Sequence, residues 1–186
     1  MKIQLPEHIG EITLEQYQRY NALIKREDLS VDNFNKRKIE IFTGLKIIDV
    51  TKIQLTDYDG ILKQIDDALS KDVGFEPFFK MKGVEFGFIP NFDKITAGEY
   101  RDLLIYNSEI DTMHNLMAIL FRPIKDKDVF GNYVIEPYRG TEQYANLMKQ
   151  MPLNIVTGAL VFFSNLANEL VSYTQRFTEA EQMRER

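Results

Sequence analysis

The sequence predicts a mainly α fold of the α+β class, in which helices surround a central C-terminal helix and one small β-hairpin is attached. Three observations lead to this prediction. Apolar residues recur at helical spacing along most of the chain, one stretch alternates with the period of a strand, and the last long apolar stretch is helical in pattern. The chain has 186 residues and no cysteine, a length at which one domain can bury a core without disulfides. We place this single domain at residues 1–173 and expect residues 174–186 to form a charged, exposed or frayed tail.

Capping signals and apolar spacing predict three helices in the first part of the chain. Thr13 with Gln16 has the pattern of a capping box in front of the first helix. Asp32 is expected to cap the second helix, and Thr56 with Asp59 to open the third. The third helix has the clearest apolar stripe, formed by Tyr58, Ile61, Leu62, Ile65 and Leu69.

The stretch FFKMKGVEFGFIPNFDKITAGEY, residues 78–100, interrupts the helical pattern. Apolar residues alternate there with charged residues and glycine, and they are Phe79, Met81, Val84, Phe86 and Phe88. Gly83 supplies a turn, so we expect a β-hairpin near residues 78–89 that ends at Pro90. An isolated hairpin is marginal in water, so its aromatic side chains lie either in the core or on a platform for a partner. We expect most of them in the core.

The second half of the chain returns to helical patterns. Thr96 with Glu99 is expected to cap one helix. The next helix places apolar residues on one face and stops before Pro123, and these residues are Ile110, Met113, Met117, Leu120 and Phe121. KDKDVFGN reads as a surface loop and YVIEPY as a short extended segment. The last helix starts at Pro152.

The last helix has two apolar faces. The first face is expected to be core and consists of Leu153, Val156, Leu160 and Phe163. The second face consists of Val161, Phe162, Leu166 and Val171. We predict that these are protein-interaction residues, which contact a second copy of this chain or another protein. Polar residues interrupt this stretch too often for a membrane span, which needs about 20 mostly apolar residues.

Composition and motifs argue against several function classes. The net charge of −5 makes a nucleic-acid partner unfavourable, because no basic field attracts phosphates. The chain has two histidines, which form no metal-binding pair, and we expect His114 to bond a backbone carbonyl at a helix boundary. No phosphate-loop, dinucleotide or hydrolase motif occurs. We therefore expect no catalytic residue, cofactor or metal; an enzyme whose site forms only in the fold is the alternative.

The order of several segments resembles a group of small proteins of tailed bacteriophages, especially crAss-like phages of Bacteroidetes hosts. The segments are FIPNFDKITAGEYRDLLIY, MHNLMAILFRPI, YVIEPYRGTE and MKQMPLNIVTGALVFFSNLANEL, and the likeness spans roughly residues 38–172. The resemblance implies a non-enzymatic virion protein, structural or cargo, that contacts other phage virion or assembly proteins. Its expected location is the virion, and the host cytoplasm during assembly. The alternative is a tail-assembly chaperone that is absent from the mature virion.

Overall fold

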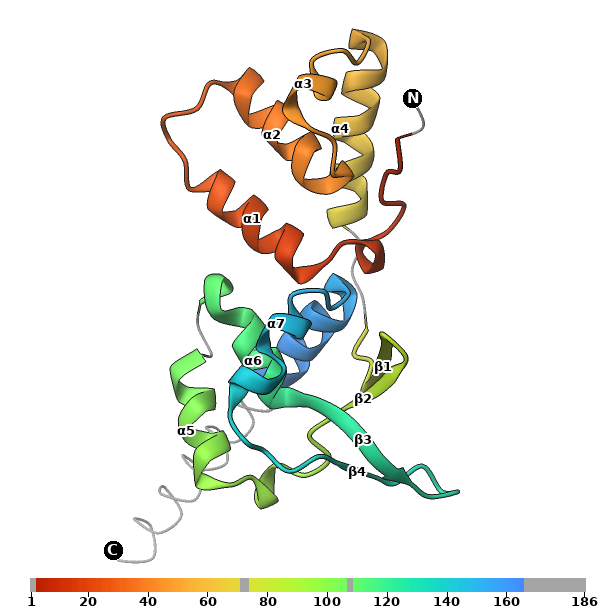
Figure 1. The fold of residues 1–186 in the computed structure, drawn as a ribbon, viewed down its shortest axis with the longest axis vertical. Coiled ribbons are helices and arrows are strands. Elements are labelled where there is room, and N and C mark those ends of the chain that lie inside the picture. The colour runs from red at the N-terminus through yellow and green to blue at the C-terminus, as the bar shows by residue number, and fades with distance from the viewer. Residues whose placement is uncertain (1–2, 71–73, 107–108, 166–186) are drawn as a thin grey trace, which may run out of the picture.

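The computed structural model describes residues 3–70, 74–106 and 109–165. The fold is mixed α+β, with 57% of the described residues helical and 13% in a four-stranded antiparallel sheet. In Figure 1 the N-terminal helices form one layer, and the sheet with the remaining helices forms a second layer beneath it. The tail expected at residues 174–186 lies outside the described residues.

The N-terminal layer is helical and its first helix begins as predicted. Its elements are a 3₁₀ turn η1 (Ile9–Glu11) and the helices α1 (Leu14–Ile24), α2 (Val31–Thr43), α3 (Ile47–Val50) and α4 (Leu55–Leu69). The Gln16 N–H donates to Thr13 Oγ1 at 3.2 Å, and the Thr13 N–H donates to Gln16 Oε1 at 2.9 Å. The predicted capping box is therefore confirmed, because it satisfies two backbone donors at the start of α1.

Two other helix starts were predicted slightly too late. Helix α2 begins after Ser30, whose hydroxyl accepts the N–H of Asn33, so Asp32 lies inside the first turn. There its carboxylate pairs with Lys36 one turn later. Helix α4 begins after Gln54, two residues before the expected cap at Thr56.

The expectation of one small hairpin is wrong, because the hairpin is half of a larger sheet. The strands are β1 (Phe78–Met81), β2 (Val84–Phe88), β3 (Phe121–Lys127) and β4 (Tyr133–Ile135), in the order β1-β2-β3-β4. The turn between β1 and β2 was predicted correctly, and Lys82 and Gly83 both have positive φ there, at 49° and 79°. The free edge of β2 then pairs with β3, where Phe88 lies opposite Phe121.

Strand β3 comes from a segment whose apolar spacing predicted the end of a helix. Helix α6 (Met113–Leu120) stops one residue early, and Phe121 adopts extended backbone as the first residue of β3. Pro123 lacks an N–H but fits the strand, because its carbonyl accepts the N–H of Glu136 at 2.9 Å. The local helical pattern therefore yields to pairing with β2 and β4.

The remaining elements are short, apart from α5 and the C-terminal helix. They are η2 (Phe92–Lys94), α5 (Ala97–Tyr106), η3 (Ile110–Thr112), η4 (Thr141–Gln143), α7 (Ala145–Met148) and a helix at residues 153–165. The start of α5 was predicted correctly, because Thr96 and Glu99 form the expected capping box.

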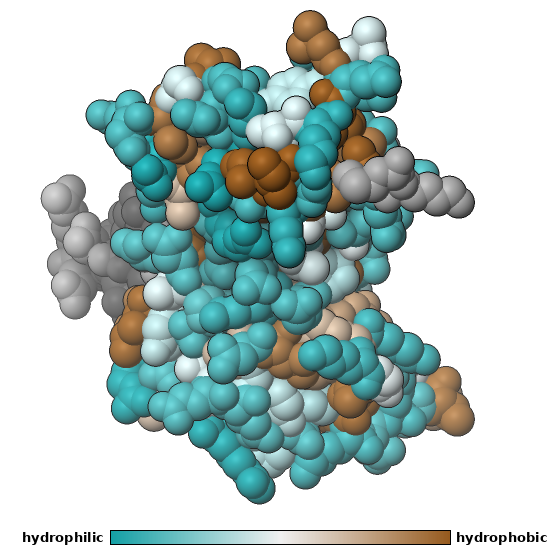
Figure 2. All heavy atoms as spheres, turned by 45° about the horizontal axis from the view of Figure 1, so that its top comes forward, coloured by the Kyte–Doolittle hydropathy of each residue, from teal (hydrophilic) through white to brown (hydrophobic). Residues whose placement is uncertain are grey.

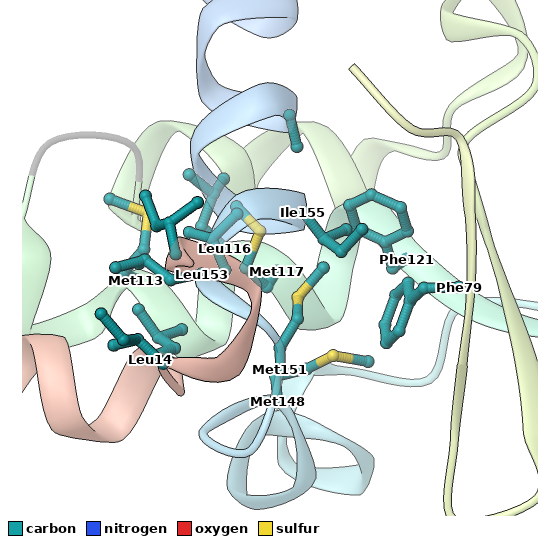
Figure 3. Packing of buried hydrophobic residues seen from close by; sticks show 14 of the residues in the cluster. Leu14, Phe79, Met113, Leu116, Met117, Phe121, Met148, Met151, Leu153 and Ile155 are labelled. Carbon is teal, nitrogen blue, oxygen red and sulfur yellow. The ribbon is translucent and has the colours of Figure 1, made fainter. Parts of the chain in front are cut away.

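The core lies between the two layers. Figure 3 shows side chains from α1, α6, the sheet and the segment that leads into the C-terminal helix meeting there. Phe79, Phe86 and Phe88 are buried in this core, which confirms the prediction for the hairpin aromatics. Among the described helices α6 is the most completely buried, so it occupies the central place expected for the C-terminal helix.

Helix α1 joins the two layers through backbone hydrogen bonds as well as apolar contacts. The Leu14 N–H donates to the Met151 carbonyl at 2.9 Å, and the Leu153 N–H donates to the Ile12 carbonyl at 2.8 Å. One hydrophobic cluster of buried residues extends from Ile9 to Ala159. The described residues therefore share one core across both layers.

Candidate functional site

Two cavities flank the segment Ile89–Asn91, which follows β2. The first, the aromatic cavity, has a volume of about 430 Å³ and is lined by Phe75, Pro77, Phe88, Ile89, Pro90, Asn91, Phe92, Asp93, Tyr133 and Phe162. The second, the arginine cavity, has a volume of about 520 Å³ and is lined by Ile89, Pro90, Asn91, Lys94, Ile95, Thr96, Glu99, Arg122 and the segment 133–138. The two cavities adjoin each other, because both are lined by Ile89–Asn91 and Tyr133, and together they are the candidate site.

Three phenylalanine rings make the wall of the aromatic cavity. Phe75 and Phe162 are stacked, with ring centroids 4.3 Å apart and planes inclined by 11°. Phe88 presents its ring at a steep angle to both, with centroid distances of 5.0 Å to Phe75 and 5.6 Å to Phe162. Such contacts stabilise aromatic pairs beyond the area they bury. They fix the orientation of the exposed part of Phe162.

A glycine brings the C-terminal helix close enough for this stack. A Cβ atom at Gly158 would lie 2.5 Å from the carbonyl oxygen of Gly74 and 3.1 Å from the Cα of Phe75. Both neighbours are backbone atoms, which cannot move aside as the end of a flexible side chain can. Glycine at position 158 therefore permits the close approach that places Phe162, one turn later, against Phe75.

A buried ion pair forms the floor of the arginine cavity. Arg122 Nη2 lies 2.6 Å from Glu99 Oε1, and the two side chains are 7% and 5% exposed. The other oxygen, Glu99 Oε2, accepts the N–H of Thr96 at 2.6 Å. The capping residue of α5 therefore also holds an arginine of β3, so the ion pair fixes α5 against the sheet.

Arg122 has unused hydrogen-bond donors. Its Nε and Nη1 are buried and make no hydrogen bond with any of the residues that the structure describes. The guanidinium carbon lies 5.5 Å from the ring centroid of Tyr138, a distance that allows a cation–π interaction. Buried donors without hydrogen-bond partners are unfavourable. The ion pair with Glu99 and the contact with the ring of Tyr138 offset part of this cost.

Titration in this region is shifted away from neutral pH. Burial acts to raise the pKa of Glu99, but the hydrogen bonds from Thr96 and the charge of Arg122 outweigh it and lower this pKa. The hydroxyl of Tyr138 donates to Asp102 Oδ2 at 2.6 Å, and this bond, with one from Arg101, lowers the pKa of Asp102. Burial, and then Asp102, raise the pKa of Tyr138. These shifts are opposite to those of a general acid or base active near neutral pH.

Of the four predicted interaction residues, Phe162 lines the aromatic cavity and Val161 precedes it on the same helix. Val161 is 58% exposed and Phe162 is 38% exposed, and both lie on the helix at residues 153–165. Leu166 and Val171 lie outside the described residues. Phe162 is less free than predicted, because the rings of Phe75 and Phe88 cover part of it.

Other residues of the site were missed by sequence reasoning. Phe75 follows a glycine in a segment without periodicity, so its pattern gave no signal. The sequence predicts Glu99 only as a helix cap, and it gives Arg122 no separate role within the segment FRPI. The available signal was an arginine at the end of an apolar helix. Arginine is rarely buried unless it is paired, so a buried Arg122 would need a charged partner.

Neither histidine forms part of a metal site in the described structure. His114 Nδ1 lies 3.1 Å from Gln18 Nε2, so its partner is a side-chain amide of α1 and not the backbone carbonyl that we expected. Within residues 3–70, 74–106 and 109–165, no three His, Cys, Asp or Glu side chains are grouped as metal ligands. In the same ranges, no helix has both the length and the hydropathy to cross a membrane.

Figure 2 shows one face of the molecule, with the N-terminal layer turned forward. Hydrophilic residues cover most of this face, and hydrophobic residues appear in separate small groups between them. Small scattered groups are normal on a protein surface, so this face gives no indication of a large contact area.

Comparisons with known proteins yield no relative for this chain. It matches no protein-family model, no curated protein and no solved structure.

Proposed function

We propose that the protein is a non-enzymatic component of a tailed-phage virion, structural or cargo, that acts through contacts with other virion or assembly proteins. It would be present in the host cytoplasm during assembly and in the particle afterwards. The observation that carries the proposed contact is the aromatic cavity with Val161 and Phe162 on its adjoining helix. Aromatic residues are enriched at protein interfaces, and a preformed cavity can accept a partner side chain with little rearrangement.

The phage part of the proposal rests on the sequence resemblance. Three of the segments that carry it lie together in the fold, because residues from 89–99, Arg122 and residues 133–138 line the arginine cavity. The Glu99–Arg122 ion pair links two of these segments directly. Their shared position supports a common structural role for them in holding the candidate site in shape.

Mass spectrometry of purified particles tests the proposal. We expect the wild-type protein in the particles and the Val161→Glu variant to be depleted at least about tenfold, a loss of about 1.4 kcal/mol in binding. A glutamate at a protein contact loses its hydration without gaining a partner. Val161 is more suitable than Phe162, because it makes no aromatic stack with the cavity wall. Ile48→Glu is the control, since Ile48 is 59% exposed on α3, close to the 58% of Val161.

Each result has a defined meaning once circular dichroism shows that both variants fold. Retention of Val161→Glu in the particles would contradict the contact surface. Absence of the wild-type protein from particles, with its presence in infected cells, would contradict a virion component and favour the assembly chaperone. Equal depletion of both variants would point to a general effect of added charge and contradict the assignment of the contact to the aromatic cavity.

A further inference from the structure

The turn between β3 and β4 exposes two apolar side chains at its tip. Val129 is 95% exposed and Phe130 is 88% exposed, more than any other large hydrophobic residue in the described chain. In Figure 1 this hairpin projects away from the rest of the sheet layer. We call Val129 and Phe130 the apolar tip. Their position gives them no contact with the core of their own molecule, although a valine and a phenylalanine are favoured in buried sites.

The turn itself holds the apolar tip in a defined conformation. Asp128 Oδ1 accepts the N–H of Phe130 and the N–H of Asn132, each at 2.9 Å, and Asp128 Oδ2 accepts Asn132 Nδ2 at 2.7 Å. The Asp128 N–H donates to the Asn132 carbonyl at 2.9 Å, and Gly131 takes up the positive φ of 88°. A local network of this kind reduces the entropy lost when the tip is bound.

The same chain carries an apolar receptor for such a tip. The aromatic cavity has a volume of about 430 Å³, and its lining is mostly aromatic or aliphatic with Asp93 as the charged residue. A phenylalanine side chain buries about 150–250 Å² when it enters a site of this type. The tip is not seated there within one molecule, since Phe130 is almost fully exposed.

We propose that the apolar tip of one copy inserts into the aromatic cavity of a second copy. The second copy is the occupant because this chain supplies both halves of the contact, a rigid apolar projection and a preformed aromatic hollow. The inference rests on the proposed function, since it names a partner for the same site. Each molecule offers one tip and one cavity, so two copies can exchange tips in a closed dimer, or the contact can repeat head to tail into a ring or a filament.

Charge does not favour this contact, because Asp128 beside the tip and Asp93 in the cavity lining are both acidic. Both oxygens of Asp128 already accept hydrogen bonds inside the turn, which reduces their repulsion toward Asp93. Lys125 and Asp126 on β3 are both exposed and their charges balance. The contact is small, below the roughly 1,200 Å² of a stable interface, so association should be weak and should rise with concentration.

Sedimentation velocity over a concentration series measures the association. We expect wild-type protein to shift toward larger species as the concentration rises, and Phe130→Glu to remain monomeric under the same conditions. Val31→Glu is the control, because Val31 is an exposed valine on α2, far from the β3–β4 turn in Figure 1. A wild-type protein that stays monomeric throughout, or a Phe130→Glu variant that associates normally, overturns the inference.

A mixing experiment separates a tip-to-cavity contact from one in which a single patch meets the same patch on a second copy. Phe162→Glu places a charge in the cavity but keeps the tip, whereas Phe130→Glu loses the tip but keeps the cavity. Neither should associate alone, and the mixture should give a 1:1 heterodimer and nothing larger. A mixture that remains monomeric overturns the inference, and so does a mixture that forms larger species. If Phe162→Glu loses its circular dichroism signal, Phe92→Glu replaces it as a second cavity variant from a different element.

The outcome can be told apart from that of the proposed function. A monomeric wild-type protein whose Val161→Glu variant is still lost from particles removes the inference and keeps the proposed function. Self-association by the expected tip-to-cavity contact, with the wild-type protein absent from particles, keeps the inference and contradicts the proposed function.

Discussion

Phe121 and Arg122 are neighbours on β3, yet their side chains enter opposite environments. Phe121 lies on the face of the sheet that packs against the core, where its ring contacts Phe79 and Phe88. Arg122 lies on the other face, where Glu99 of α5 and the ring of Tyr138 cover it. Both side chains are buried, although one is apolar and the other is charged.

The comparison shows that a buried side chain contributes to the stability of the fold in a different way on each face of the sheet. On the core face, stability rises with the apolar area removed from water and with close packing. On the arginine face, attraction within the ion pair offsets the loss of hydration, so the pair contributes little in net terms but is costly to break. The predictions below test this difference.

The largest effect is expected from Phe86→Ala on the core face. The Phe86 ring is fully buried and stacks on Phe79 with centroids 5.3 Å apart. Its removal leaves a cavity, so we expect a loss of about 3 to 5 kcal/mol in the free energy of unfolding. Urea denaturation followed by circular dichroism measures this loss. Val84→Ala on the same strand is the control, because Val84 is exposed and its loss should be below about 1 kcal/mol.

An intermediate effect is expected from Arg122→Met on the other face. Methionine keeps much of the volume but leaves the Glu99 carboxylate buried without its cation, and we expect a loss of about 3 kcal/mol. The double variant Glu99→Gln/Arg122→Met removes both charges and should regain at least about half of that loss, as measured by the same denaturation. If the double variant is less stable than Arg122→Met alone, the ion pair does not behave as a mutually dependent buried pair and the comparison between the faces fails.

The smallest effect is expected from the titration of Glu99 on the arginine face, which makes the stability of the protein depend on pH. The pKa of Glu99 is lowered in the folded protein from its ordinary value of 4.5, so the unfolded chain takes up a proton at a higher pH than the folded protein. The stabilisation is therefore complete above the ordinary pKa and is lost as the pH falls through the lowered one. We therefore expect the wild-type protein to lose stability as the pH falls below the ordinary pKa of 4.5.

Thermal denaturation at a series of pH values isolates this contribution when wild type is compared with Glu99→Gln. The variant should show a shallower decline toward acid, because glutamine does not titrate. Asp102, whose pKa is also lowered by its bonds to Tyr138 and Arg101, remains in both proteins and contributes equally. Parallel curves for the two proteins would show that Glu99 contributes nothing to acid sensitivity.

Local features of the fold were predicted where neighbouring residues supply the whole signal. The capping boxes at Thr13 and Thr96 involve residues three positions apart. The turn at Lys82 and Gly83 needs positive φ in a two-residue loop, which glycine makes accessible. Apolar spacing indicated a helix from Pro152, and the structure has a helix at residues 153–165 with Phe162 in the lining of the aromatic cavity.

The rest of the site could not be predicted because its residues come together from distant segments. The rings of Phe75 and Phe162 are stacked, although most of the C-terminal half of the chain separates these residues in the sequence. Nothing in the local pattern around either residue predicts the contact. Arg122 and Glu99 belong to a strand and a helix whose contact depends on β3 joining β2. The residues of the cavities are therefore set by the packing of elements and not by a motif.

The sequence by itself determined where α1 and α5 begin, that residues 78–88 form a hairpin, and that Phe79, Phe86 and Phe88 of this hairpin are buried. These outcomes follow from spacing and capping, which act over a few residues. Only the tertiary structure decided that Phe121 leaves helix α6 and that the hairpin becomes part of a four-stranded sheet. The Phe121 N–H still donates to the Met117 carbonyl of α6, but the extended backbone of Phe121 pairs with Phe88. Phe88 lies more than thirty residues earlier in the chain, where local spacing carries no information.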